Sequence, residues 1–307
     1  MKHGQAGKRR FSRQRVADNV AAYLFLSPFL AGLVAIIAGP MASSLYLSFT
    51  DYGGFGLPEW VGLENYARAF GDPRMWTAAR VTVTYTATAV PSVVLFALLL
   101  ATALNRGVGF LPVYRAVFYV PSLIGGSVAV ALLWRQVFGA TGLLNHALNL
   151  IGIQHQTSWI GSPSTALGTL VVLQTWQFGS AMVIFLAGLR QIPRSYYEAA
   201  SVDGAGRFQQ FVFITLPMLS PLILFSTVMA MIGALQAFNA AYIISGGSGG
   251  PADSTLYFTL YLYQQGFVNF QFGYASALGW LLILTIATAT AALITGTRRW
   301  VHYGESA

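Results

Sequence analysis

Six long apolar runs alternate with polar segments along the chain of 307 residues. They occupy residues 21–49, 81–104, 116–134, 165–189, 222–244 and 274–296. A helix needs about 20 apolar residues to cross the roughly 30 Å hydrocarbon core of a bilayer, and each run is long enough. The pattern therefore predicts an all-α, polytopic membrane protein with six transmembrane helices.

Basic residues indicate which side of the membrane each polar segment faces. With few exceptions, the 17 Lys and Arg residues fall in alternate segments. The exceptions are Arg68, Arg74, Arg80 and Arg135. Because cytoplasmic loops carry an excess of Lys and Arg, segments 1–20, 190–217 and 298–307 are predicted to be cytoplasmic and 50–79 to be an external loop. Both termini are then expected in the cytoplasm, in a multi-pass protein of the cytoplasmic membrane.

The composition agrees with this class of protein. Hydrophobic residues make up 55% of the chain and charged residues 8%, with a mean hydropathy of +0.60. A net charge of +8 would suggest nucleic-acid binding in a soluble protein. Here the basic residues are explained by their clustering in the segments predicted to be cytoplasmic, so no nucleic-acid partner is expected. The chain has no Cys, which excludes disulfides, thiolate catalysis and Cys-ligated metals.

The six runs contain no Asp, Glu, His, Lys or Arg. Ionisable groups inside the membrane are the usual device of proton-coupled carriers and voltage sensors, so both are disfavoured, whereas sodium coupling through carbonyls and hydroxyls stays open. The two lysines, Lys2 and Lys8, lie in no phosphate-binding loop. The spacing of His146 and His155 matches no metal site. The chain is therefore expected to be no enzyme, to hold no cofactor or metal, and to take its energy from another subunit.

One polar island, residues 196–221, separates the fourth and fifth runs. Ser195 is predicted to cap a short helix with Glu198 in its first turn, and Gly204 to end that helix in a left-handed conformation. A second short helix is predicted from Ala205 to Leu216. The pattern is specified by seven positions, Glu198, Ala199, Ala200, Gly204, Ile214, Leu216 and Pro217, and Asp203 beside Gly204 is a further candidate of the same site.

These spacings resemble the EAA loop of ATP-binding-cassette (ABC) importer permeases of the carbohydrate branch, in particular the MalF-like subunits. Segments 47–52, 61–66 and 119–122 are also similar to that family. The resemblance implies a type-1 permease fold with its core at 80–297, and a loop at 190–217 that docks as a coupling helix on an ATPase. The implied partners are a MalG-like second permease, two ABC ATPase subunits that bind ATP and Mg²⁺, an extracytoplasmic sugar-binding protein and membrane lipid.

Uncharged polar residues in the fourth and fifth runs are candidates for a sugar pathway. They recur at intervals of three residues, as expected for one helix face, and an aromatic ring lies beside the first set. The candidates are Trp176, Gln177, Ser180, Gly233, Gln236 and Asn239. Amides and hydroxyls pair with sugar hydroxyls, and a Trp ring can cover the apolar face of a pyranose. The alternative is that these residues only hydrogen-bond neighbouring helices.

The predicted function is that of a permease subunit in an ATP-driven, binding-protein-dependent sugar importer. Glycerol phosphate or another polyol remains open as the cargo. A secondary carrier is a less favoured alternative, because its coupling residues are missing from the runs. A non-transporting membrane scaffold would have no use for the polar island.

Overall fold

The structure is a computed structural model that describes residues 19–20, 22–105, 110–153 and 157–297. The predicted cytoplasmic tail at 298–307, nearly all of the basic segment at 1–20, and His155 lie outside the described residues. Within the described chain, four helices are long and apolar enough to cross a membrane, and two bent helix pairs raise the number to six if each is one span. The architecture is all-helical apart from one two-stranded ribbon.

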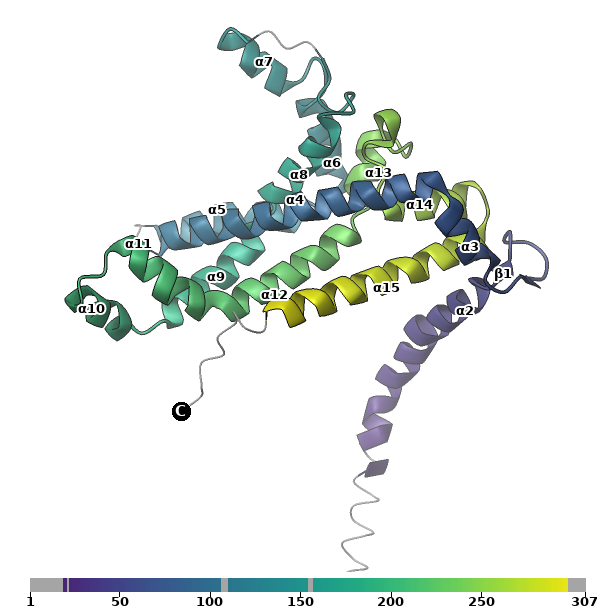
Figure 1. Cartoon of the computed structure of the whole chain (residues 1–307), viewed down its shortest axis with the longest axis horizontal. Helices are drawn as coiled ribbons and strands as arrows, with labels where there is room; N and C mark the ends of the chain where they lie inside the picture. The colour runs from purple at the N-terminus through teal and green to yellow at the C-terminus, as the bar shows by residue number, and fades with distance from the viewer. Residues whose placement is uncertain (1–18, 21, 106–109, 154–156, 298–307) are drawn as a thin grey trace, which may run out of the picture.

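The first long helix, Ala22–Leu47, stands apart from the rest of the molecule (Figure 1). It contains the π-helical segment η1 (Leu33–Ala38) and α2 (Gly39–Leu47). None of its most apolar stretch is buried within the chain, and its main contact with α15 is made by α2. A helix that is apolar all round and uncovered needs lipid or another protein around it.

Most of segment 50–79, predicted as a loop, has regular structure. Strands β1 (Thr50–Asp51) and β2 (Glu59–Trp60) pair antiparallel, and α3 (Glu64–Gly71) follows. The next helix, α4 (Pro73–Leu104), begins eight residues before the expected position 81. The reason is Asp72, whose side chain accepts hydrogen bonds from the backbone N–H groups of Arg74 and Met75 and so caps the helix.

The third apolar run is not the single span predicted for 116–134. Helices α5 (Leu111–Ile124) and α6 (Val128–Val137) meet at 99°. Gly125 and Gly126 form the break, and the Ser127 hydroxyl accepts a hydrogen bond from the N–H of Val130, which starts α6 afresh. Beyond α6 lies the short helix α7 (Leu143–Leu150), which is preceded by Gly142 and has no side-chain cap.

The fourth run is also divided, into α8 (Ala166–Trp176) and α9 (Gly179–Gln191) with a 42° bend. After α10 (Arg194–Val202), one helical run extends from Arg207 to Ser245. It comprises α11 (Arg207–Gln210), η2 (Phe211–Thr215), α12 (Leu216–Leu235) and α13 (Asn239–Ser245). The second short helix predicted at 205–216 is therefore not a separate element, because it continues into the fifth span.

The segment between the fifth and sixth runs is partly helical. It contains η3 (Pro251–Asp253), α14 (Phe258–Tyr263) and η4 (Gln264–Val268). The last helix, α15 (Phe272–Thr297), extends the run predicted at 274–296 by only a few residues.

Helix α4 is the centre of the packing and contacts α8, α9, α12 and α14. Ala97 and Ala101 of α4 are fully buried, and their small side chains let neighbouring helices approach closely. Gly179 plays the same part in α9, because an added Cβ would lie 2.3 Å from the carbonyl oxygen of Phe118 in α5. Helices α10 and α11 lie at one end of the elongated body, whereas α3 and α14 lie at the other (Figure 1).

Candidate functional site

Helix α10 carries most of the predicted coupling residues at the exposed end of the molecule. Glu198, Ala199, Asp203 and Gly204 are exposed, and Ala200 is half-buried. The helix begins at Arg194, after Pro193, without a side-chain cap. The prediction that Ser195 caps the helix is therefore wrong, and Glu198 lies in its second turn. Pro193, which fixes its own backbone at a helix start, was the signal for the true beginning.

Gly204 ends α10 in a left-handed conformation with φ +78°, which confirms the prediction. Its N–H donates to the carbonyl of Ser201 (3.1 Å), and the N–H of Ala205 donates to the carbonyl of Ala200 (2.8 Å). These bonds satisfy carbonyl groups that the end of a helix otherwise leaves unpaired. The chain is thereby turned back sharply toward the membrane-spanning run.

A set of side-chain hydrogen bonds fixes α10 to the start of that run, which we call the stem (Arg207–Thr215). The Tyr197 hydroxyl bonds to the Thr215 hydroxyl at 3.0 Å. The Gln210 amide donates to the Ser201 hydroxyl (2.9 Å) and to the Ala205 carbonyl (3.1 Å). Sequence reasoning missed these contacts, since no periodicity links a helix to a residue beyond a turn.

The remaining coupling candidates belong to the stem and the helix after it. Ile214 and Leu216 pack against an apolar cluster built from α4, α9 and Leu219. Pro217 has no N–H to give the preceding turn, and the N–H of Leu216 bonds five residues back to Phe211, which makes this turn π-helical. Ile214, Leu216 and Pro217 therefore anchor and shape the stem, while α10 presents the exposed surface.

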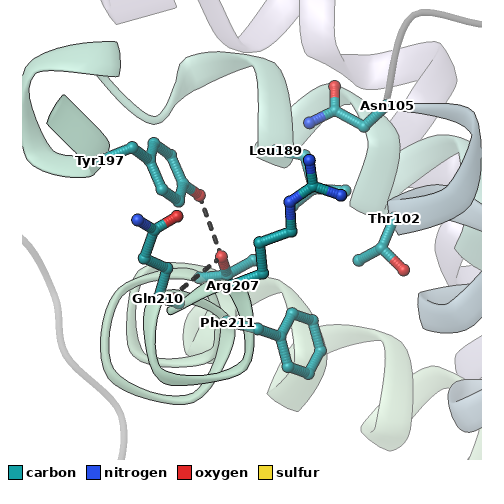
Figure 2. Close-up of a pocket in the computed structure, with 8 residues that line it drawn as sticks. Thr102, Asn105, Leu189, Tyr197, Arg207, Gln210 and Phe211 are labelled. Carbon is teal, nitrogen blue, oxygen red and sulfur yellow. Dashed lines mark hydrogen bonds between the residues drawn. The ribbon is translucent and has the colours of Figure 1, made fainter. Parts of the chain in front are cut away.

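Between α10, the stem and the ends of α4 and α9 lies a cavity of about 480 Å³, which we call the stem cavity. Figure 2 shows the Arg207 side chain extending from the stem toward Asn105 and Leu189. The lining residues are Thr102, Asn105, Leu189, Tyr197, Arg207, Gln210, Phe211 and Thr215.

A second cavity, of about 320 Å³, lies where three helix breaks meet, and we call it the break cavity. Gly125 to Ser127 separate α5 from α6, Gln177 separates α8 from α9, and residues 236–238 separate α12 from α13. Irregular backbone inside a membrane protein is tolerated where protein buries it or where it lines a water-filled cavity. The lining residues are Tyr85, Gly125, Gly126, Ser127, Ala131, Gln174, Gln177, Gly233, Gln236, Ala237, Phe238, Asn239 and Ala240.

Four of the six pathway candidates line this break cavity: Gln177, Gly233, Gln236 and Asn239. Ser180 instead lines a separate cavity of about 460 Å³ together with Arg115 and Tyr119. The ring of Trp176 does not line the break cavity but packs against Trp134, with 5.9 Å between ring centroids. Trp176 is thus not the stacking wall that was expected.

Gln174, which belongs to the same three-residue repeat as Gln177, lines the cavity as well, whereas sequence reasoning missed two lining residues, Tyr85 and Phe238. The Tyr85 hydroxyl donates to the Gln174 side-chain oxygen at 3.3 Å, and the Gln177 amide donates to the Leu173 carbonyl at 3.2 Å. Tyr85 and Phe238 supply aromatic surface in place of Trp176. A lone Tyr within an apolar run was the available signal for Tyr85. The described lining holds amides, hydroxyls and rings but no charged side chain.

Comparison with known proteins decides the class of protein. The model of the family described as "Binding-protein-dependent transport system inner membrane component" matches residues 81–301, more than half of the chain. The chain belongs to this family. It is therefore a multi-pass membrane component of a binding-protein-dependent transport system, and the predicted class of transporter is confirmed.

Individual relatives cover almost the whole chain. It is 49% identical to the probable ABC transporter permease protein YesP of Bacillus subtilis over 293 residues, with 95% of each chain covered. It is 35% identical to the lactose transport system permease protein LacF of Rhizobium radiobacter, covering 91% of this chain and 94% of LacF.

Among solved structures, a chain of a bacterial alginate ABC transporter, in complex with its alginate pentasaccharide-bound periplasmic protein, superposes with a TM-score of 0.81. The two chains are 20% identical, and 95% of this chain and 98% of that one are covered. This similarity confirms the predicted type-1 ABC permease fold.

Proposed function

We propose that this chain is one of two permease subunits of an ATP-driven importer and passes a neutral mono- or oligosaccharide through the break cavity. The observation that carries the proposal is the convergence of Gln177, Gln236 and Asn239 on a cavity formed by three helix breaks. Amide groups both donate and accept hydrogen bonds, as sugar hydroxyls require. The rings of Tyr85 and Phe238 offer apolar surface to the sugar ring.

The absence of charge among the described lining residues favours a neutral sugar over glycerol phosphate. A phosphorylated cargo would leave its charge unpaired in this cavity, which is costly away from water. The relative LacF, named for lactose transport, supports an uncharged saccharide.

The second part of the proposal concerns coupling. The exposed face of α10, with Glu198, Ala199 and Asp203, docks on an ATPase subunit, which binds ATP and Mg²⁺. Glu198 offers a carboxylate to a cation there, and the small Ala199 and Ala200 allow close approach. A MalG-like permease, a second ATPase and an extracytoplasmic sugar-binding protein complete the assembly.

The proposal fixes the orientation in the membrane: both termini and α10 face the cytoplasm, and α3 and α14 face outward. The native chain has no Cys, so a single Cys introduced at position 195 reports its own accessibility. An impermeant thiol reagent added to intact cells should leave this Cys unlabelled and should label it after the membrane is opened. Labelling in intact cells would reverse the assignment.

The pathway is tested in the assembled transporter reconstituted in liposomes. Gln177→Leu and Gln236→Leu should lower the rate of sugar uptake, because each removes a hydrogen-bonding group from the cavity while keeping similar bulk. Gln136→Leu is the matched control, since Gln136 is exposed on α6 and lies outside the cavity. Assembly with the ATPase and affinity of the binding protein should stay normal.

Uptake at the wild-type rate by both cavity variants would refute the pathway. A different outcome separates the alternative role: if these glutamines only hold helices together, the variants should melt at lower temperature and assemble poorly, with uptake reduced in proportion to the assembled fraction.

A further inference from the structure

Two exposed side chains that line the stem cavity make no hydrogen bond to any residue that the structure describes. Most of the cavity's polar side chains are committed elsewhere: Thr102 donates to the carbonyl of Leu99 at 2.8 Å, and Tyr197 and Thr215 bond to each other. The amide of Gln210 is bonded to Ser201 and Ala205. These bonds leave the amide of Asn105 and the guanidinium of Arg207.

Arg207 and Asn105 come from different elements and converge on the same space. Figure 2 shows the guanidinium extending from the stem toward Asn105, which follows the last residue of α4. Within the described residues, neither side chain has a hydrogen-bond partner, and the one ion pair joins Asp253 to Arg74, which lies at the other end of α4 from Asn105. Among the described residues that line the cavity there is no Asp or Glu. The cavity therefore presents a cation and an amide without an anion.

We propose that the stem cavity binds the phosphate group of a small anionic ligand. A guanidinium offers several N–H donors in one plane, a geometry that matches phosphate oxygens, and the Asn105 amide adds donors from a second direction. The volume of about 480 Å³ accommodates such a group together with water. Because the cavity lies where the membrane-spanning helix α4 ends, the phosphate belongs either to a phospholipid headgroup or to a soluble compound.

Binding at this place has a consequence for α10. A phosphate held by Asn105 and Arg207 joins the end of α4 to the stem, and Tyr197 of α10 forms another wall of the same cavity. The ligand would therefore restrain the movement of α10 relative to the membrane-spanning body. This makes the cavity a regulatory site, independent of which cargo is carried.

The test uses the full-length chain in a neutral detergent, stripped of lipid and titrated during native mass spectrometry. The probes are phosphatidylglycerol, diacylglycerol with the same acyl chains, and inorganic phosphate. Phosphatidylglycerol or inorganic phosphate should bind, and Arg207→Gln should weaken that binding about tenfold, as expected for one charge-assisted hydrogen-bonding group. Asn105→Leu should weaken binding by a smaller factor.

Arg190→Gln is the matched control: Arg190 is an exposed arginine at the end of α9 that does not line the cavity, and its loss should leave binding unchanged. Arg207→Lys keeps the charge and should retain part of the affinity, even if Arg207→Gln folds poorly. Arg207-dependent binding of phosphatidylglycerol alone assigns a lipid, and Arg207-dependent binding of inorganic phosphate assigns a soluble source. Equal binding by wild type and Arg207→Gln, or equal binding of diacylglycerol and phosphatidylglycerol, overturns the proposal.

Discussion

Replacement of Gly204 by Ala isolates the contribution of one backbone conformation to the end of α10. Gly204 has φ +78°, and an added Cβ would meet nothing within 4 Å. The substitution therefore introduces no collision, and its cost is the left-handed strain of an L-residue, about 1–2 kcal/mol. Gly206 is the matched control, because it undergoes the same substitution two residues away at φ −71°.

The strain should be released where α10 is weakest, at its last turn. The N–H groups of Gly204 and Ala205 bond to α10 carbonyls there, and the helix contributes no buried residue. A destabilisation of 1–2 kcal/mol corresponds to roughly 5- to 30-fold more frequent opening. Hydrogen exchange of these two amides should accelerate by that factor in Gly204→Ala, while amides of α4 keep their wild-type rates.

In the assembled transporter, the same variant should lose part of its substrate-stimulated ATP hydrolysis. Gly204→Asn should recover much of the protection of these two amides against hydrogen exchange, since Asn tolerates the left-handed region better than Ala. The reasoning is refuted if Gly204→Ala and Gly206→Ala exchange at the same rate, because the backbone conformation would then carry no special cost.

Three further predictions concern other parts of the chain. Glu198→Lys should leave the permease inserted but abolish ATPase binding in a pull-down, because the carboxylate is replaced by a cation. Gly179→Ala should lower the free energy of unfolding by about 1–3 kcal/mol through overpacking. Gly168→Ala should leave it unchanged, because nothing lies within 4 Å of the added Cβ. Burial raises the pKa of Asp72, but hydrogen bonds, chiefly from Tyr261, outweigh it and hold that pKa below its ordinary 3.8. The stabilisation by the Asp72 carboxylate should therefore be complete well above pH 3.8 and be lost as the pH falls through its lowered pKa. The difference in melting temperature between wild type and Asp72→Asn should accordingly become smaller as the pH falls through that range.

Hydrophobic periodicity predicted the long helices well and the breaks poorly. The last span, α15, matches its apolar run closely because nothing interrupts it. Gly125 and Gly126, by contrast, are small residues that could equally serve close helix packing, whereas the structure uses them to turn the chain by 99°. Hydropathy cannot separate these roles, because both leave the segment apolar.

The same limitation explains the pathway candidates. An interval of three residues places side chains on one face only while the helix continues. Gln177 lies at the break between α8 and α9, so Ser180 begins a helix of different direction and reaches another cavity. Gly233 and Gln236 remain together because only the end of α12 separates them. The sequence places an aromatic ring at Trp176 but does not show that it packs against Trp134. That contact depends on where α6 lies relative to α8, which hydropathy does not predict.

The meeting of three helix breaks at one cavity determines where the molecule is mechanically compliant. Helix α4 passes the cavity as one continuous helix, whereas the other helices that meet there are interrupted beside it. The 20 residues of α12 form a lever of about 30 Å between the stem and the break at 236–238. If α10 docks on an ATPase as proposed, a displacement applied to it should be transmitted along this lever to the wall of the cavity, where the interrupted helices bend most easily.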